Sequence, residues 1–296
     1  MQYKGVTIHY HLMLLPGMII LFIYNLLPIS GNIMAFQDYI PAKGISGSEW
    51  IGFENFTYMF ELESSRRVFF NTIFIASMKI IMNIIVPVTF ALLLNEVIFM
   101  KIKRSIQTIV YLPHFLSWVV LAGVLIDMLS GNGLINKVIS FFTGETMFFL
   151  ASNTWFPVVI VLSDVWKEFG FNAIIILAAL TAINPALYEA ADIDGASRLR
   201  KIWHITLPGI APTIVLLSTL SIGQILNAGF DQIFNLYNPL VYESGDIIDT
   251  YVYRTGLINA QFGLATAVGM MKAVIGFVLI ILSYRLAYRY ANYRIF

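Results

Sequence analysis

Three groups of polar side chains interrupt segments of the chain that are otherwise apolar. Within each group every member lies three or four positions from another member, so a helix would present them on one face. The groups are Lys79 with Asn83, Asp164 with Lys167 and Glu168, and Gln224 with Asn227 and Asp231. Ionisable side chains in such segments are costly unless they are paired or hydrated, so each group is a candidate functional site.

Polar and aromatic side chains on one helix face are suited to binding sugars. The polar groups can bond hydroxyls, and flat aromatic rings can pack against the C–H surface of a sugar ring. Trp166 and Asn172 lie beside the second group, which therefore predicts part of a sugar path. Gly170 in the same segment predicts an interruption of the helix that admits polar backbone to a cavity.

A purely structural role is the alternative for these groups. Lys79 and Asn83 fit a path and a structural pairing equally well, and a pair between Asp164 and Lys167 could simply hold helices together. The spacing of the third group favours a path lining. Lys272 is expected to be the structural partner of an acidic residue.

The sequence contains no signature of an enzyme or a metal site. It has no glycine-rich phosphate loop with a Gly-Lys-Ser or Gly-Lys-Thr end, so the chain is not expected to bind ATP itself. Neither GxSxG nor HExxH occurs. There is no cysteine, and the histidines are scattered at positions 9, 11, 114 and 204. We therefore expect a chain that is not an enzyme and binds no metal or cofactor of its own.

The elements that position these residues are predicted to be membrane helices. Hydrophobic residues make up 58% of the 296 and charged residues only 12%, whereas soluble domains carry about 25% charged residues. Apolar runs of about 20 residues predict an all-α protein in a lipid bilayer. A net charge of +1 without a basic tail does not indicate nucleic-acid binding. We predict one transmembrane domain over residues 1–296, with six helices at about 12–36, 68–94, 105–130, 155–182, 209–231 and 262–286.

The distribution of basic residues predicts the orientation. A five-helix alternative would put the chain ends on opposite sides. With six helices and a cytoplasmic start, ten lysines and arginines fall in inner segments and five in outer segments, counting Arg294 among the inner ones. Because cytoplasmic segments carry the excess of positive charge, both ends are predicted to be cytoplasmic. The segment 184–208 is then cytoplasmic as well.

That segment predicts a helix–turn–helix between the fourth and fifth spans. Asn184 followed by Pro185 is a strong helix start. Gly195 can end or bend the first helix, since glycine adopts positive φ without penalty. A second short helix is expected over about 196–205, with Pro208 ending it.

The same segment resembles the EAA signature of binding-protein-dependent ABC importer permeases, which reads Glu-Ala-Ala, then Asp-Gly-Ala, then Ile-x-Leu-Pro. The matching residues are Glu189, Ala190, Ala191, Asp194, Gly195, Ala196, Ile205, Leu207 and Pro208. Nearly the whole chain is similar to the sugar-permease branch with the MetI-like fold, including IIILAALTAINPALYEAA and YLPHFLSWVV. The run FDQIFNLYNPLVYESGDIIDTYVYRTGL looks most like the LplB-type subgroup, which is associated with uptake of oligosaccharides or polysaccharide fragments.

The resemblance implies a set of partners. These are a second permease subunit, usually a distinct paralogue, two ATPase subunits that carry ATP and Mg, and an extracellular solute-binding lipoprotein. It also implies that the matching residues of the loop, from Glu189 to Pro208, couple this chain to the ATPase. The expected location is the bacterial plasma membrane.

The expected function is that of a permease subunit of a type I ABC importer for a carbohydrate, most consistent with an oligosaccharide. A rigid cytoplasmic helix that docks on an ATPase can convert closure of a soluble dimer into motion of membrane helices. Uptake of a non-sugar solute is one alternative. An ion-coupled secondary transporter is another, in which Lys79, Asp164 and Glu168 would carry ions or protons, but it has no use for such a loop.

Overall fold

The computed structural model describes residues 3–291, which are mostly helical. Expectations for the chain ends at 1–2 and 292–296, including Arg294, lie outside the described residues. Within the described part, five helices are long and apolar enough to cross a membrane, and six if a bent pair counts as one span. The predicted all-α membrane architecture is confirmed.

The candidate spans agree with four of the six predicted ranges. They lie at His9–Phe36, Glu63–Asn95, Trp118–Thr143, Trp155–Thr181, Arg198–Ile222 and Phe262–Arg289, with Trp155–Thr181 bent by 69° from the following helix Pro185–Ile193. The third and fifth differ from the predicted 105–130 and 209–231, and both differences have local causes.

The chain folds into two compact units, Met1–Ser65 with Tyr251–Met271 and Arg66–Thr250 with Lys272–Phe296. The first unit contains α1 (Tyr3–Leu21), a π-helical turn (Phe22–Leu26), a 3-10 helix (Leu27–Phe36), β1 (Gln37–Asp38), α2 (Gly44–Gly47), β2 (Glu49–Trp50), α3 (Glu54–Glu61) and a π-helical turn (Arg254–Ile258). In it β1 and β2 pair antiparallel, with Gln37 opposite Trp50. The Asn55 amide donates to the carbonyls of Ala35 (3.0 Å) and Gln37 (3.1 Å), which fixes this hairpin against α3.

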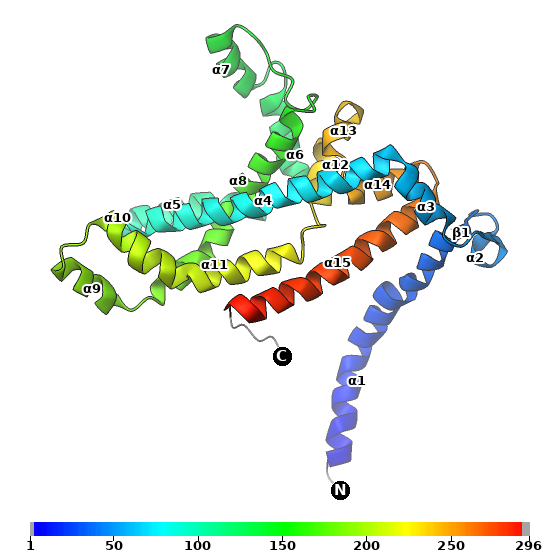
Figure 1. Cartoon of the computed structure of the whole chain (residues 1–296), viewed down its shortest axis with the longest axis horizontal. Coiled ribbons are helices and arrows are strands. Elements are labelled where there is room, and N and C mark those ends of the chain that lie inside the picture. The colour runs from blue at the N-terminus through cyan, green and yellow to red at the C-terminus, as the bar shows by residue number, and fades with distance from the viewer. Residues whose placement is uncertain (1–2, 292–296) are drawn as a thin grey trace. The chain divides into compact units, whose positions relative to one another are not determined.

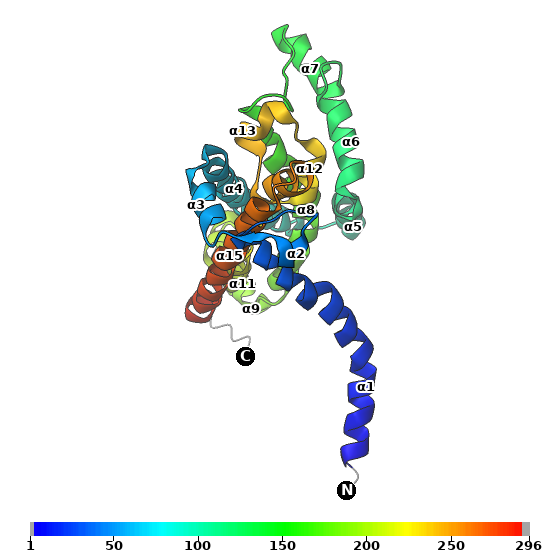
Figure 2. The same ribbon diagram turned by 90° about the vertical axis from the view of Figure 1, so that its right-hand side faces the viewer.

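The second unit holds most of the helices. They are α5 (Met100–Tyr111), α6 (Trp118–Leu129), α7 (Leu134–Thr143), α8 (Trp155–Thr181), α9 (Pro185–Ile193), α10 (Arg198–Lys201), α11 (Leu207–Ile222), α12 (Phe230–Leu236) and α13 (Tyr242–Gly245). Three further helices have residues in both units, namely α4 (Glu63–Asn95), α14 (Ile248–Tyr253) and α15 (Phe262–Ala291). Within the second unit α7 and α9 lie far apart in both views (Figure 1, Figure 2).

Two of the apolar clusters in the second unit involve helix α8 and its neighbours. One joins α4, α8 and α12 through buried residues that include Ile75, Phe156 and Ile233. The other joins α4, α8 and α11 through Ala91, Ile176, Ile210 and their neighbours. Because α4 and α8 both belong to both clusters, they pack along their length, and polar side chains between them are held in fixed positions.

The predicted third span is broken between α5 and α6. Pro113 lacks the N–H that a continuing helix needs, and the chain makes a short 3-10 turn over Leu112–Phe115. The Lys167 ammonium donates to the His114 carbonyl at 2.8 Å, which satisfies a backbone group that the break leaves open. Ser117 then caps α6, accepting from the Val120 N–H. Hydropathy alone does not detect such a break.

The predicted fifth span is also broken. Helix α11 ends at Ile222, and residues 223–229 are not helical before α12 begins at Phe230. Gly229 has φ +97°, a conformation that side-chain-bearing residues rarely adopt. The prediction of one continuous helix over 209–231 was therefore wrong.

Gly170 and Pro208 do not have the roles predicted for them. Helix α8 is continuous through Gly170, where a Cβ atom would lie 2.4 Å from the Val110 carbonyl oxygen, so the glycine permits close packing of α5 on α8. Pro208 does not end the second helix of the loop. A π-helical turn at Ile202–Thr206 leads directly into α11, and Pro208 lies in its first turn, where a missing N–H is tolerated.

Candidate functional site

A polar cavity of about 380 Å³ lies in the second unit between α4, α8 and the broken end of α11. Ligand sites commonly occupy about 300–1,000 Å³, so this volume is adequate for part of a small ligand. Its lining residues are Ala76, Lys79, Ile80, Asn83, Asp164, Glu168, Asn172, Leu217, Leu220, Ser221, Gln224, Asn227, Ala228 and Gly229. We refer to it as the polar cavity.

The cavity brings together seven of the ten residues that were predicted to line a path. They are Lys79, Asn83, Asp164, Glu168, Asn172, Gln224 and Asn227. The three groups of polar side chains, which are far apart in the sequence, thus meet at one place. The remaining three, Trp166, Lys167 and Asp231, are not among its lining residues in the described structure.

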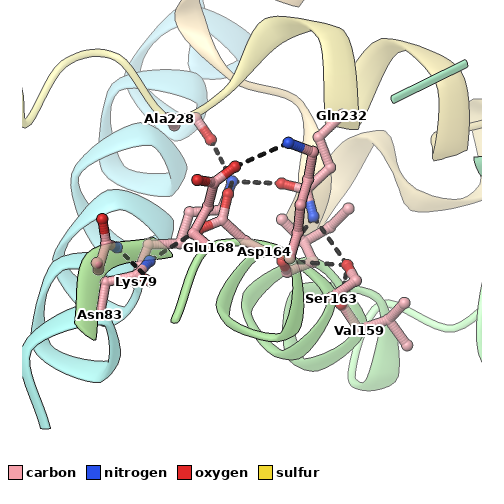
Figure 3. A network of polar contacts seen from close by, with 11 residues as sticks. Lys79, Asn83, Val159, Ser163, Asp164, Glu168, Ala228 and Gln232 are labelled. Carbon is pink, nitrogen blue, oxygen red and sulfur yellow. Dashed lines mark hydrogen bonds and ion pairs between the residues drawn. The ribbon is translucent and has the colours of Figure 1, made fainter. Parts of the chain in front are cut away.

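Lys79 lies at the centre of a polar network that joins three helices (Figure 3). Its side chain is buried, with 6% of the residue exposed. The ammonium pairs with an Asp164 carboxylate oxygen at 3.1 Å, donates to the Ala228 carbonyl at 2.7 Å and donates to the side-chain oxygen of Gln232. Asp164 also accepts from the Asn83 amide at 2.9 Å. The charges of Lys79 and Asp164 are therefore balanced within the protein.

A second charge cluster lies one turn further along α8. The Lys167 ammonium donates to Glu168 at 2.9 Å and to the His114 carbonyl, and it lies 5.7 Å from the centre of the Trp118 ring. Glu168 also contacts His114 Nδ1 at 2.7 Å, and the His114 ring stacks on Phe171 with centroids 3.9 Å apart. This cluster fixes the break between α5 and α6 against α8.

The amide side chains of the cavity keep polar atoms without a protein partner. Asn172 donates weakly to the Asn83 oxygen at 3.4 Å, and Asn227 donates to the Gln224 oxygen at 2.7 Å. Among the described residues, no protein group forms a hydrogen bond with the Gln224 amide nitrogen or with the side-chain oxygens of Asn172 and Asn227. Neutral donors and acceptors at the edge of a cavity are suited to hydroxyl groups.

The other three predicted path residues lie elsewhere. Trp166 is 47% exposed on the surface of α8, and Lys167 is buried in the cluster with Glu168. Asp231 is exposed in the first turn of α12. Its spacing from Gln224 assumed a continuous helix, and the break at 223–229 removes that relation.

Sequence reasoning missed Gln232, which belongs to the Lys79 network, and His114, which belongs to the second charge cluster. The Gln232 amide donates to the Ile160 carbonyl at 2.7 Å and to the Ser163 hydroxyl at 2.8 Å. The glycine three positions before Gln232 was the available signal for a new helix start. Lys272 pairs with Asp249 at 2.5 Å, as expected for a structural partner of an acid.

The segment 184–208, which we call the 184–208 hairpin, is held by several local bonds. The Asn184 oxygen accepts from the Ala186 N–H at 3.0 Å, so the predicted helix start is confirmed. Gly195 has φ +71° and turns the chain between α9 and α10. The two arms are tied by Tyr188 with Thr206 (2.9 Å) and by Lys201 with Asp192 (2.7 Å).

The 184–208 hairpin presents much of its surface to solvent. Glu189, Ala190, Asp194 and Gly195 are exposed, whereas Ala191, Ala196 and Leu207 are partly buried and Pro208 is exposed. It also exposes large apolar side chains, with Ile193 87% and Leu199 70% exposed. A hairpin whose arms are tied together and that exposes apolar and acidic groups is suited to docking on another protein.

The chain matches a known family and several known proteins. Residues 83–292 match the family described as "Binding-protein-dependent transport system inner membrane component". The Bacillus subtilis (strain 168) "Polygalacturonan/rhamnogalacturonan transport system permease protein YteP" is 43% identical over 95% of this chain and 88% of its own length. Protein LplB of the same organism is 42% identical over 91% of this chain and 85% of its own length.

A solved structure has the same fold. It is described as a bacterial ABC transporter involved in the import of the acidic polysaccharide alginate, and it matches with a TM-score of 0.87 and 38% identity over 97% of this chain and 98% of that one. A second structure, of the alginate transporter in complex with an alginate pentasaccharide-bound periplasmic protein, matches equally, over 98% of each chain.

Proposed function

Because this chain belongs to the family of binding-protein-dependent transport system inner membrane components, we propose that it forms part of the membrane path of an ATP-driven importer for a carbohydrate, specifically an oligosaccharide. The chain is a multi-pass transport subunit and not an enzyme. The observation that carries the substrate class is the polar cavity, whose unpaired groups are amides at Asn172, Gln224 and Asn227. Amides bond the hydroxyl groups that every sugar ring carries.

The names of similar proteins support a carbohydrate as the substrate. One is named for polygalacturonan and rhamnogalacturonan transport, and the solved transporter imports alginate. The carboxylates of the cavity give less support to an ion-coupled mechanism, because Asp164 and Glu168 are each bound to a lysine and to a further side chain. Carboxylates that are already paired in this way are less suited to carrying an ion or a proton.

The proposed assembly contains a second permease subunit of distinct sequence, two ATPase subunits that bind ATP and Mg, and an extracellular solute-binding lipoprotein. The 184–208 hairpin would dock on the ATPase and place this face of the chain in the cytoplasm, together with both chain ends. The cell membrane of a bacterium is the proposed location. Sugar would enter from the binding protein when the path opens outward, and ATP hydrolysis would reset the path.

Reconstitution into vesicles tests this proposal. The complete complex is placed in liposomes that contain ATP, and the binding protein is added outside with radiolabelled oligogalacturonides or neutral oligosaccharides. We expect saturable uptake of one of these probes that requires both ATP and the binding protein. Uptake driven by an ion gradient without ATP, or uptake of peptides or polyamines with no uptake of any oligosaccharide, would contradict the proposal.

A further inference from the structure

All the donors of the Lys79 ammonium are used inside the protein. A lysine has three N–H groups and no acceptor. Asp164, Ala228 and Gln232 each supply one oxygen to it, from α8, from the non-helical segment and from α12 respectively. Since no N–H remains for a ligand, the position of Lys79 on the cavity wall is not that of a sugar-binding residue.

The partner of most consequence is the non-helical segment 223–229. Its buried residues include Leu226 and Ala228, at 4% and 1% exposed, whereas Gln224 and Asn227 are exposed toward the polar cavity. A buried carbonyl outside a helix needs a donor, and for Ala228 that donor is Lys79 (Figure 3). At Gly229 a Cβ atom would lie 2.9 Å from the Lys79 nitrogen, so the glycine makes room for the ammonium.

Gln232 extends this attachment to the central helix. Its oxygen accepts from Lys79 while its amide donates to Ile160 and Ser163 of α8. The chain on both sides of Gly229 is therefore bonded to the same lysine. The Lys79 nitrogen thus contacts α8, the segment and α12 at the same time.

We propose that Lys79 is a positioning residue that fixes the segment 223–229, and thereby holds Gln224 and Asn227 on the wall of the polar cavity. The segment continues α11, which begins with the last two residues of the 184–208 hairpin, Leu207 and Pro208. The stretch of chain that starts at the hairpin is thus bonded, at its far end, to Lys79 of α4. The role assigned to Gln224 and Asn227 rests on the proposed function, whereas the attachment itself does not.

A buried cysteine reports on this attachment. The chain has no cysteine, so Ala228→Cys gives it a single thiol at a buried position. The complete complex is treated with N-ethylmaleimide, and labelling of this chain is measured on a gel. Because labelling requires local opening, Lys79→Met should speed it by about tenfold or more, through loss of charge-assisted hydrogen bonds.

A double variant separates positioning from simple charge balance. In Lys79→Met with Asp164→Asn no uncompensated carboxylate remains, but Ala228 and Gln232 still lack their donor. We expect labelling to stay fast in the double variant. A return to the wild-type rate would show that Lys79 only neutralises Asp164 and would overturn the proposal, as would unchanged labelling in Lys79→Met.

A matched control and a milder variant complete the experiment. Lys272→Met with Asp249→Asn removes another lysine–aspartate pair of the same unit, and labelling at Ala228→Cys should not change. If neither Lys79 variant assembles, Gln232→Met is measured, and unchanged labelling there would overturn the proposal. Oligosaccharide uptake is recorded in parallel. A failure of wild-type uptake with the expected labelling pattern contradicts the proposed function alone.

Discussion

At the scale of single residues, Gly229 occupies a position where any side chain would strain the backbone. Its φ of +97° costs about 1–3 kcal/mol for another residue, and an added Cβ atom would lie 2.9 Å from the Lys79 nitrogen. Gly229→Ala is therefore expected to reduce uptake. It should also lower, by several degrees, the temperature at which half of the purified complex has come apart.

Gly123→Ala is the matched control for that measurement. Gly123 lies within α6, and nothing surrounds the position where its Cβ atom would be. Alanine is the better helix former, so this change should leave the temperature unchanged or raise it. An equal loss of assembly in both variants would show that the backbone conformation at Gly229 has no special importance.

The composition of the polar cavity could be predicted from the sequence only in part. The i, i+4 spacing of Lys79 and Asn83 holds because α4 is an unbroken helix, and both residues line the cavity. The same argument fails at Asp231, because a helix break changes which side chains share a face. Which hydrogen bonds Lys79 makes depends on packing between distant segments, and spacing carries no information on that.

At the scale of elements, we expect the 184–208 hairpin to move as one body because its two arms are tied together. The Tyr188 hydroxyl and the buried Thr206 form one of these ties. Tyr188→Phe removes it at a cost of about 1 kcal/mol. We expect amide hydrogen exchange over residues 198–206 to become about fivefold faster, and uptake to fall while assembly persists.

Tyr10→Phe is the control for the tie. Tyr10 is 62% exposed and lies in α1, in the other unit of the chain. Removal of the Tyr10 hydroxyl should change neither hydrogen exchange in the hairpin nor uptake. Exchange in Tyr188→Phe that matches the wild type would mean that the hairpin is held by its remaining bonds alone.

The helix starts and turns of the hairpin could be predicted from the sequence, whereas the role of Pro208 could not, and the difference has a physical reason. Asn184, Pro185 and Gly195 act through local backbone geometry, so the hairpin and its turn could be predicted. Pro208 was assigned a helix end because proline usually stops a helix from its interior. The π-helical turn at Ile202–Thr206 instead places it in the first turn of α11, which no local pattern reveals.

At the scale of the whole molecule, the proposed topology puts the hairpin and the segment after α12 on opposite sides of the membrane. Asp192→Cys and Leu240→Cys each give this chain a single exposed thiol. In intact cells a membrane-impermeant maleimide is expected to label Leu240→Cys, and to label Asp192→Cys only after the membrane is opened. The reverse pattern would overturn the orientation.

In the proposed mechanism, one part of the chain receives force from the ATPase and another part contacts the substrate. Glu189 is exposed on the 184–208 hairpin, and Asn172 lines the polar cavity. Glu189→Lys should lose uptake together with the stimulation of ATP hydrolysis by the binding protein. Asn172→Leu should lose uptake and keep much of that stimulation. Glu189→Gln and Thr181→Val, which alter the same helices more mildly, serve as controls.

The most direct measurement is therefore oligosaccharide uptake and ATP hydrolysis recorded on the same vesicles for Glu189→Lys and Asn172→Leu. We expect ATP hydrolysis stimulated by the binding protein to be lost in Glu189→Lys and retained in Asn172→Leu, with uptake low in both. Equal loss of stimulated hydrolysis in both variants, or normal coupled uptake in Glu189→Lys, would contradict the proposed mechanism.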